Sequence, residues 1–210
     1  MQVSGSLRGS LVVLAAVLAL GGCAAQQRMS DADRAKYRTV KMGEATKGKA
    51  YILAPGTSLG LMFGAVGGAA TGGAVESDVK IFDDFLAKHG IQVEKIASEE
   101  VAAALRESGK LQLAAPGDAG AAVLNVEVAQ YGFGVPTLVS STVVPVIYLK
   151  LQLADGSGKP LWVDGERLLP SMANPIDATT WEALRNDPKL VEAKLRQAAR
   201  IAAQRLFTAL

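Results

Sequence analysis

The side chains that could carry out chemistry are few in this sequence. The chain has one histidine, His89, and one cysteine, so a multi-histidine metal site is excluded, and no serine or cysteine nucleophile accompanies His89. We interpret His89 as a surface residue at a helix end, where the dipole favours a cation. The acidic pairs at 83–84 and 99–100 are solvated helix faces, because neighbouring helical side chains point about 100° apart and do not converge as an acid and a base would. We therefore expect no enzyme, no catalytic residue, no metal and no cofactor.

The cysteine lies where covalent modification is expected. An apolar run at residues 11–20 follows Arg8 and is too short to span a bilayer. After it, Leu20, Gly21, Gly22 and Cys23 resemble the lipobox of bacterial lipoproteins. The resemblance implies that residues 1–22 are a signal peptide, that Cys23 is acylated, and that the protein is anchored permanently by its lipid. Ala24 stands where retention in the inner membrane usually needs aspartate, so the resemblance favours the outer membrane, with the body in the periplasm.

A second unusual feature is a run without charge at residues 57–75, which contains a glycine every four residues: Gly60, Gly64, Gly68 and Gly72. It lacks the lysine of a P-loop and does not fit the dinucleotide fingerprint. If helical, it would form a glycine zipper that lets two backbones approach closely, or that contacts the membrane. The glycines also disfavour a helix by about 1 kcal/mol each, so a mobile loop or flap is the other interpretation.

The overall charge limits the class of partner. The chain has 22 basic and 20 acidic residues, a net charge of +2, and 210 residues in all. This balance provides no basic stripe that could neutralise a row of phosphates, so we expect no nucleic acid as partner.

The elements that must position these residues follow from the periodicity. Residues 23–48 are polar without an apolar period and predict a tether; residues 49–210 predict one folded domain with an insertion at 57–75. Within it we expect a strand at 49–55, a helix at 76–88, a short strand at 91–96, and a helix from Ser98 to Gly109. A strand at 121–130, a hairpin at 148–163 turning at 155–158, and a helix starting with Asp187 and Pro188 complete the pattern. The predicted fold class is α/β, a mixed sheet with helices packed on it.

Four segments of this pattern resemble a group of periplasmic lipoproteins. They are the strand 50–55, the passage FLAKHGIQVEKIASEEVAAALRESG, the strand AAVLNVEVAQYG and the hairpin LQLADGSGKPLWVDG. The chain is similar here to the TolB amino-terminal domain, the curli secretion lipoprotein and the lipoprotein activators of penicillin-binding proteins. The resemblance implies a domain without catalytic activity that docks onto envelope proteins or assembles with its own copies. The long alternating strands of a curli-type pore are missing from 57–75 and 131–148, which argues against such a pore.

The pattern also predicts where a partner binds. The strands that end near residues 55 and 130 should run parallel, because helices connect them, and their carboxyl ends should share one sheet edge. Two uncharged segments leave that edge, and we expect a docking edge there or, alternatively, that both fold back into the core. The candidate residues are Phe63, Phe133, Leu138, Val139 and Val143.

Two functions follow from these expectations. The first is an outer-membrane lipoprotein that acts as a docking or assembly module for an envelope protein complex. The alternative is a structural lipoprotein that assembles with itself, or contacts the membrane, through the glycine zipper.

Overall fold

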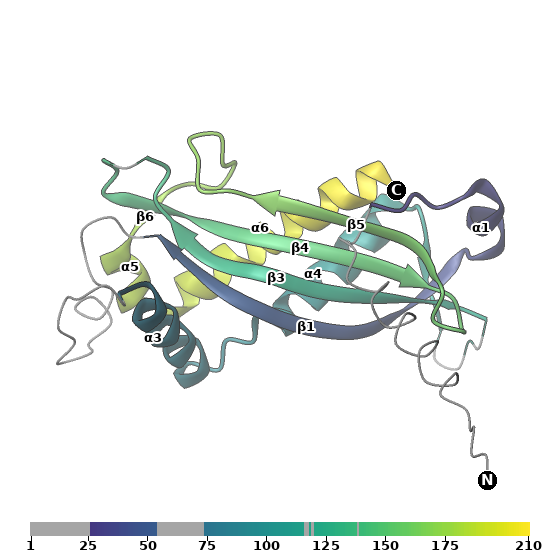
Figure 1. The fold of residues 1–210 in the computed structure, drawn as a ribbon, viewed down its shortest axis with the longest axis horizontal. Helices are drawn as coiled ribbons and strands as arrows, with labels where there is room; N and C mark the ends of the chain where they lie inside the picture. Colours follow the sequence, from purple (N-terminus) through teal and green to yellow (C-terminus); the bar gives the residue numbers. More distant parts are fainter. Residues whose placement is uncertain (1–25, 54–73, 116–117, 119, 138) are drawn as a thin grey trace, which may run out of the picture.

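The computed structural model of the protein describes residues 26–53, 74–115, 118, 120–137 and 139–210 (Figure 1). A curved sheet forms one layer, and helices cover one of its faces. The predicted fold class, a mixed sheet with helices packed on it, is therefore confirmed. The signal peptide, Cys23 and the glycines of the zipper lie outside the described residues.

The sheet has the strand order β2-β1-β3-β4-β5, and β6 pairs with β4 off this path. Its central members are β1 (Thr39–Leu53), β3 (Ala122–Gly134) and β4 (Thr142–Ala154), with β5 (Pro160–Leu168) at one edge. The short strand β2 (Gln112–Leu113) pairs with β1, and the short strand β6 (Thr179–Thr180) pairs with β4. β1 runs parallel to β2 and β3, as expected for the strands that helices connect, whereas β3, β4 and β5 are antiparallel.

Five helices are described. α4 (Val93–Ser108) and α6 (Pro188–Ala209) lie side by side across the sheet, and α3 (Ala74–Lys88) packs beside the end of β1. The short helices α1 (Asp31–Lys36) and α5 (Trp181–Asn186) lie toward opposite ends of the sheet. The helix predicted from Asp187 and Pro188 is confirmed, since the Asp187 side chain caps the amides of Lys189 and Leu190.

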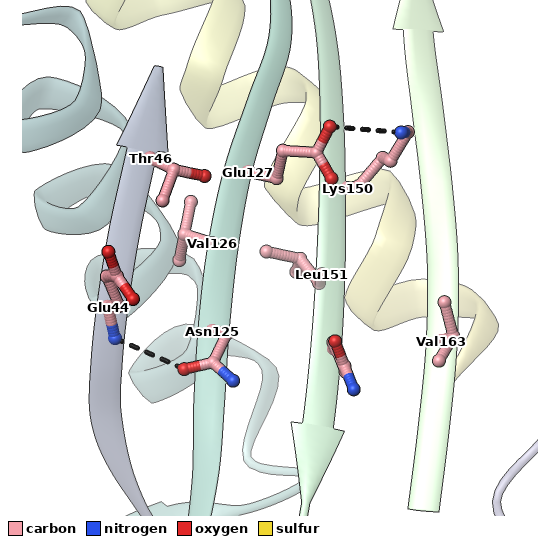
Figure 2. Close-up of a pocket in the computed structure, with 9 residues that line it drawn as sticks. Glu44, Thr46, Asn125, Val126, Glu127, Lys150, Leu151 and Val163 are labelled. Atoms are coloured by element: carbon pink, nitrogen blue, oxygen red, sulfur yellow. Dashed lines mark hydrogen bonds and ion pairs between the residues drawn. The ribbon is translucent and has the colours of Figure 1, made fainter. Parts of the chain in front are cut away.

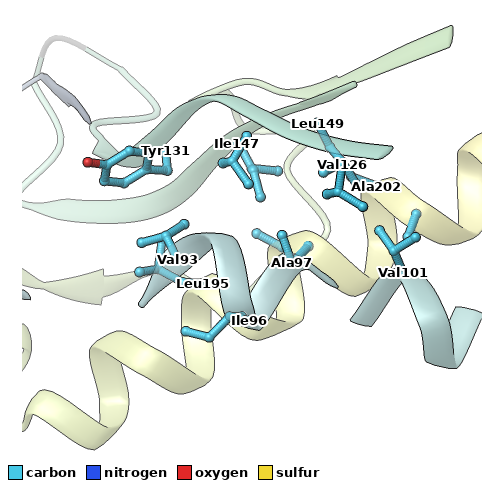
Figure 3. Close-up of a cluster of buried hydrophobic side chains, with 14 of the residues drawn as sticks. Val93, Ile96, Ala97, Val101, Val126, Tyr131, Ile147, Leu149, Leu195 and Ala202 are labelled. Atoms are coloured by element: carbon cyan, nitrogen blue, oxygen red, sulfur yellow. The ribbon is translucent and has the colours of Figure 1, made fainter. Parts of the chain in front are cut away.

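The core lies between the sheet and the pair α4 and α6 (Figure 3). Branched side chains of β3 and β4 point down onto the helices, and alanines at the contact let the helices approach closely. Members of this cluster are Val126, Ile147, Leu149, Val93, Ile96, Ala97, Val101, Leu195 and Ala202. Burial of this apolar surface is the main stabilising contribution to the fold.

The hairpin and its relation to the last helix also agree with the sequence. β4 and β5 pair Leu153 with Trp162, and the turn between them uses the Asp155 carboxylate to accept the Ser157 and Lys159 amides. Trp162 is 2% exposed and stacks on Phe207 of α6 at 6.3 Å between ring centroids. Trp162 is therefore buried under the C-terminal helix.

The predicted tether is wrong for most of its length. Residues 31–36 form α1, and β1 begins at Thr39 instead of residue 49. A β-bulge between Met42 and Ala45 shifts the alternation of inward side chains, so no steady apolar period marks the strand. A Cβ atom at Gly43 would lie 2.1 Å from Asn125 Oδ1 and 2.6 Å from Val123 Cγ1, so a larger residue there would displace both side chains.

The short strand expected at 91–96 is also wrong. α3 ends in a turn at Gly90, which has a φ of 68°, and α4 begins at Val93, five residues before the expected cap Ser98. The apparent alternation was the first turn of a helix, because Val93, Ile96 and Ala97 recur at helical spacing and all three are buried.

Candidate functional site

The structure places some residues of the predicted docking edge in the core and another on the surface. Phe133 and Val143 are fully buried, so they cannot contact a partner, and both predictions are wrong. Val139, by contrast, is 95% exposed. Phe63 and Leu138 lie outside the described residues.

Phe133 is buried because it is the centre of an aromatic cluster. The ring of Phe82 from α3 meets it edge-on at 6.0 Å, and the ring of Trp181 from α5 meets it at 6.2 Å. This arrangement is the preferred geometry for aromatic pairs. The apolar end of β3 therefore holds α3 and α5 against the sheet, which is the core alternative that the sequence left open.

Exposed apolar side chains gather instead on two loops at this end of the sheet. Residues 135–141 connect β3 to β4, and residues 169–178 connect β5 to β6 (Figure 1). They carry Val139, Leu169 at 59% exposure and Met172 at 80%, which are the exposed large hydrophobic residues of the described chain. We call these three residues the apolar tip. Large apolar side chains exposed at one end of a fold mark a candidate contact site.

The second loop is held against the sheet by one side chain. Asn174 donates from Nδ2 to the carbonyls of Pro145 at 3.0 Å and Leu169 at 3.1 Å, and its Oδ1 accepts from the Ile176 amide at 3.0 Å. Ile176 is buried. The loop is thus fixed at both sides of Met172 while that side chain stays exposed, so Leu169 and Met172 have a defined position.

Leu169 and Met172 were not predicted from the sequence. The signal that could have found them is the uncharged stretch at residues 168–176, which contains two prolines and follows a predicted strand. Its loop lies at the same end of the sheet as residues 135–141. Loops of this kind on a rigid scaffold often carry binding residues.

The face of the sheet that the helices leave open has a shallow polar groove of about 250 Å³ (Figure 2). At one side of it, Asn125 Oδ1 accepts the Glu44 amide at 3.1 Å, which satisfies a backbone donor freed by the bulge in β1. Toward the middle, Lys150 and Glu127 are directly opposite on β4 and β3, and their charged groups are 3.0 Å apart. The polar groups of the groove therefore include one ion pair and one hydrogen bond from the backbone to a side chain.

The groove continues to an aromatic ring between two cations. Arg167 lies 4.0 Å from the centroid of the Tyr148 ring and Lys150 lies 5.2 Å from it. These contacts stabilise the ring on the sheet face. Among the residues that line the groove, no nucleophile is paired with a base.

A second polar cluster joins α3 to the sheet. The Tyr131 hydroxyl donates to Asp83 Oδ1 at 2.5 Å, and Lys47 Nζ lies 3.5 Å from the same oxygen. Burial raises the pKa of Tyr131 well above its ordinary value of 10.0, and the hydrogen bond and negative charge of Asp83 act in the same direction. Asp83 is therefore a structural residue that docks α3, not only part of a solvated face.

The interpretation of Glu100 as solvated is wrong as well. Glu100 is 8% exposed and accepts from Arg196 at 2.9 Å and Arg200 at 3.0 Å, so it links α4 to α6. Its hydrogen bond, with that of Glu99, raises the pKa of Arg196 above its ordinary value. His89 agrees with its interpretation: it is exposed, directly follows α3 and packs against the Phe85 ring.

Within the described ranges, no group of three or more histidine, cysteine, aspartate or glutamate side chains is placed to hold a metal ion. No helix among them is both long and apolar enough to cross a bilayer.

Comparison with known proteins finds likeness in structure alone. No protein-family model matches the chain, and no curated protein matches it. Among solved structures, the PelC dodecamer of Paraburkholderia phytofirmans is similar at 15% identity and a TM-score of 0.40, over 90% of this chain and 98% of that one. Lipoprotein GNA1162 of Neisseria meningitidis is similar at 16% identity and a TM-score of 0.24, over 77% and 97%.

Both likenesses are distant. Their TM-scores are below 0.5, so the functions of these proteins are not transferred to this chain. The resemblance to the TolB amino-terminal domain and to the activators of penicillin-binding proteins stays a prediction.

Proposed function

We propose that this chain is a lipoprotein of the bacterial envelope that works without catalysis, by docking its folded domain onto another envelope protein. The observation that carries the proposal is the apolar tip. Val139, Leu169 and Met172 are exposed together at one end of a rigid sheet, although exposed apolar surface is unfavourable in water. A protein partner that covers these side chains would remove that cost.

The anchoring part of the proposal rests on Cys23 and the leader before it. Labelling with a clickable fatty acid should tag the natural chain and leave Cys23→Ser untagged. Equal labelling of both would show that the lipid is not on Cys23. Separation of inner and outer membranes should place the labelled protein in the outer membrane.

The docking part is tested by photo-crosslinkers placed at Val139 and at Met172, with Ala35 on α1 as the control at the other end of the sheet. Both tip positions should capture the same envelope protein, and Ala35 should not. Capture of a second copy from both positions would favour the alternative, self-assembly. Unrelated products from the two positions would argue against one docking surface.

A matched substitution separates binding from folding. Met172→Asp should abolish the crosslink from Val139 while leaving the free energy of unfolding within about 0.5 kcal/mol of the natural chain, because an exposed side chain contributes little to stability. If the crosslink persists, Met172 is not in the contact.

A further inference from the structure

The N-terminal segment is fastened to the body almost from its first described residue. Gln27 exchanges backbone hydrogen bonds with Val163 on the outer edge of β5, at 2.9 and 3.0 Å. The Gln26 side chain donates to Asp164 and the Gln27 side chain donates to the Pro160 carbonyl. These contacts leave no free tether after Gln26.

Further contacts hold the residues between Gln27 and β1. Met29 is 5% exposed and belongs to the core, and Ser30 caps α1 by accepting the Asp33 amide. Arg34 donates to the carbonyl of Leu210, the last residue of the sequence. The segment 26–38 is therefore part of the rigid body.

Only Ala24 and Ala25 separate Gln26 from the proposed anchor, Cys23. At 3.8 Å between successive Cα atoms, Cys23 lies at most about 11 Å from Gln26. An acylated Cys23 sits at the bilayer surface, so Gln26 and the edge of β5 that it contacts must lie close to that surface, and the rest of segment 26–38 continues from there.

The charge of this segment suits such a place. Arg28, Lys36 and Arg38 are exposed, and none of them takes part in an ion pair within the described residues. With Arg34 the segment has four basic residues against two acidic ones, Asp31 and Asp33, so its net charge is +2. Exposed cations next to a bilayer are attracted to anionic lipid headgroups.

We propose that segment 26–38 is a surface that binds the anionic headgroups of the membrane to which the chain is anchored. The proposal rests on the lipid attachment in the proposed function. It adds an orientation: α1 faces the bilayer, while α3, at the opposite end of the sheet, stands away from it (Figure 1).

The test uses the full mature lipidated protein in vesicles of phosphatidylethanolamine and phosphatidylglycerol. A fluorophore is attached to Ala35→Cys on α1 or to Ala87→Cys on α3, two exposed helical alanines that form a matched pair. Brominated lipids should quench the Ala35 label several-fold more than the Ala87 label. Equal quenching, or stronger quenching at Ala87, would overturn the proposal.

Two variants identify the cause of the quenching. The first variant has twenty glycine and serine residues inserted between Ala25 and Gln26, a spacer that spans about 25 Å on average. When this spacer is combined with Arg28→Gln, Lys36→Gln and Arg38→Gln, quenching of the Ala35 label should fall to the level of the Ala87 label. With the spacer alone, the cations should keep part of the signal in anionic vesicles and lose it in pure phosphatidylcholine or at high salt. A signal that ignores vesicle charge and salt would overturn the headgroup contact.

Failure of the proposed function is recognised separately. Mass spectrometry of the purified protein shows whether Cys23 carries acyl chains before any quenching is measured. An unacylated Cys23 would contradict the proposed function, whereas an acylated protein with a weakly quenched Ala35 label would contradict only the orientation.

Discussion

Gly132 on β3 lies directly against the backbone of Tyr51 on β1. Its φ is 144°, and a Cβ atom there would lie 2.0 Å from the carbonyl oxygen of Tyr51. Gly132→Ala should therefore lower the free energy of unfolding by about 2 kcal/mol or more, through backbone strain and overpacking. Chemical denaturation measures the change, and Gly156→Ala is the control because nothing lies within 4 Å of its added Cβ. Equal midpoints for the two variants would contradict this account.

The Tyr131 phenol provides a pH-dependent contribution to stability. Its pKa in the folded chain is raised above 10.0, mainly by burial. Below pH 10 the phenol is protonated in both the folded and the unfolded chain, so its contribution to stability does not change with pH. Above pH 10 the unfolded chain loses this proton first, so the fold loses stability at up to about 1.4 kcal/mol per pH unit.

Tyr131→Phe should remove this alkaline loss while costing about 1 kcal/mol at neutral pH for the lost hydrogen bond to Asp83. Urea titrations of both chains between about pH 8 and pH 11.5 give the comparison, since the other tyrosines and the lysines contribute equally to both. Parallel pH profiles would show that Tyr131 ionises normally in the folded chain.

At the scale of the elements, Trp162 is one of the side chains through which the hairpin packs on α6. Trp162 lies on β5 and packs on Phe207 of α6. Trp162→Ala should cost about 3–5 kcal/mol in the free energy of unfolding, because it leaves a cavity under the helix. Differential scanning calorimetry or denaturant titration measures it, with Met172→Ala as the exposed control. A midpoint like that of the control would show that this contact contributes little to stability.

The elements that the sequence predicted correctly are marked by residues that lie close together in the sequence. α6 begins at a capping aspartate and a proline, and its buried side chains keep a helical period to Phe207. β1 and the start of α4 were missed for physical reasons. In β1 the bulge at Gly43 and Glu44 interrupts the alternation of buried and exposed side chains. At the start of α4, six residues are too few to distinguish the two-residue period of a strand from the 3.6-residue period of a helix.

Contacts between distant residues were not predictable from local pattern. Glu100 looked like any solvated helix charge, and only the packing of α4 on α6 brings Arg196 and Arg200 to it. Likewise Phe133 looked like an exposed loop residue until α3 and α5 supplied Phe82 and Trp181. The apolar end of the sheet could be located from the sequence, but the side chains that face inward there could not be distinguished from those that face solvent.

For the whole molecule, the corrected start of the domain makes a clear prediction. β1 is a central strand from Thr39, and the segment before it is fastened to β5 and to Leu210. A chain that begins at Gln26 should fold cooperatively, and one that begins at Gly48 should not, because it lacks the half of β1 that pairs with β2 and the start of β3. Circular dichroism and denaturant titration of both chains decide. A cooperative transition in the shorter chain at the same midpoint would restore the view of residues 26–47 as a tether.

The pairing of β1 with β3 also determines when the protein can fold. Val40 pairs with Ala122, so β1 cannot pair with β3 until the ribosome has synthesised a much later part of the chain. The helix α6, which covers the core, is synthesised later still. Pairings between residues so far apart in sequence have a high contact order and form slowly. The proposed export of the chain requires such a delay, because a secreted chain passes through a translocation channel before it folds. The topology itself therefore favours a nascent chain that stays open for export.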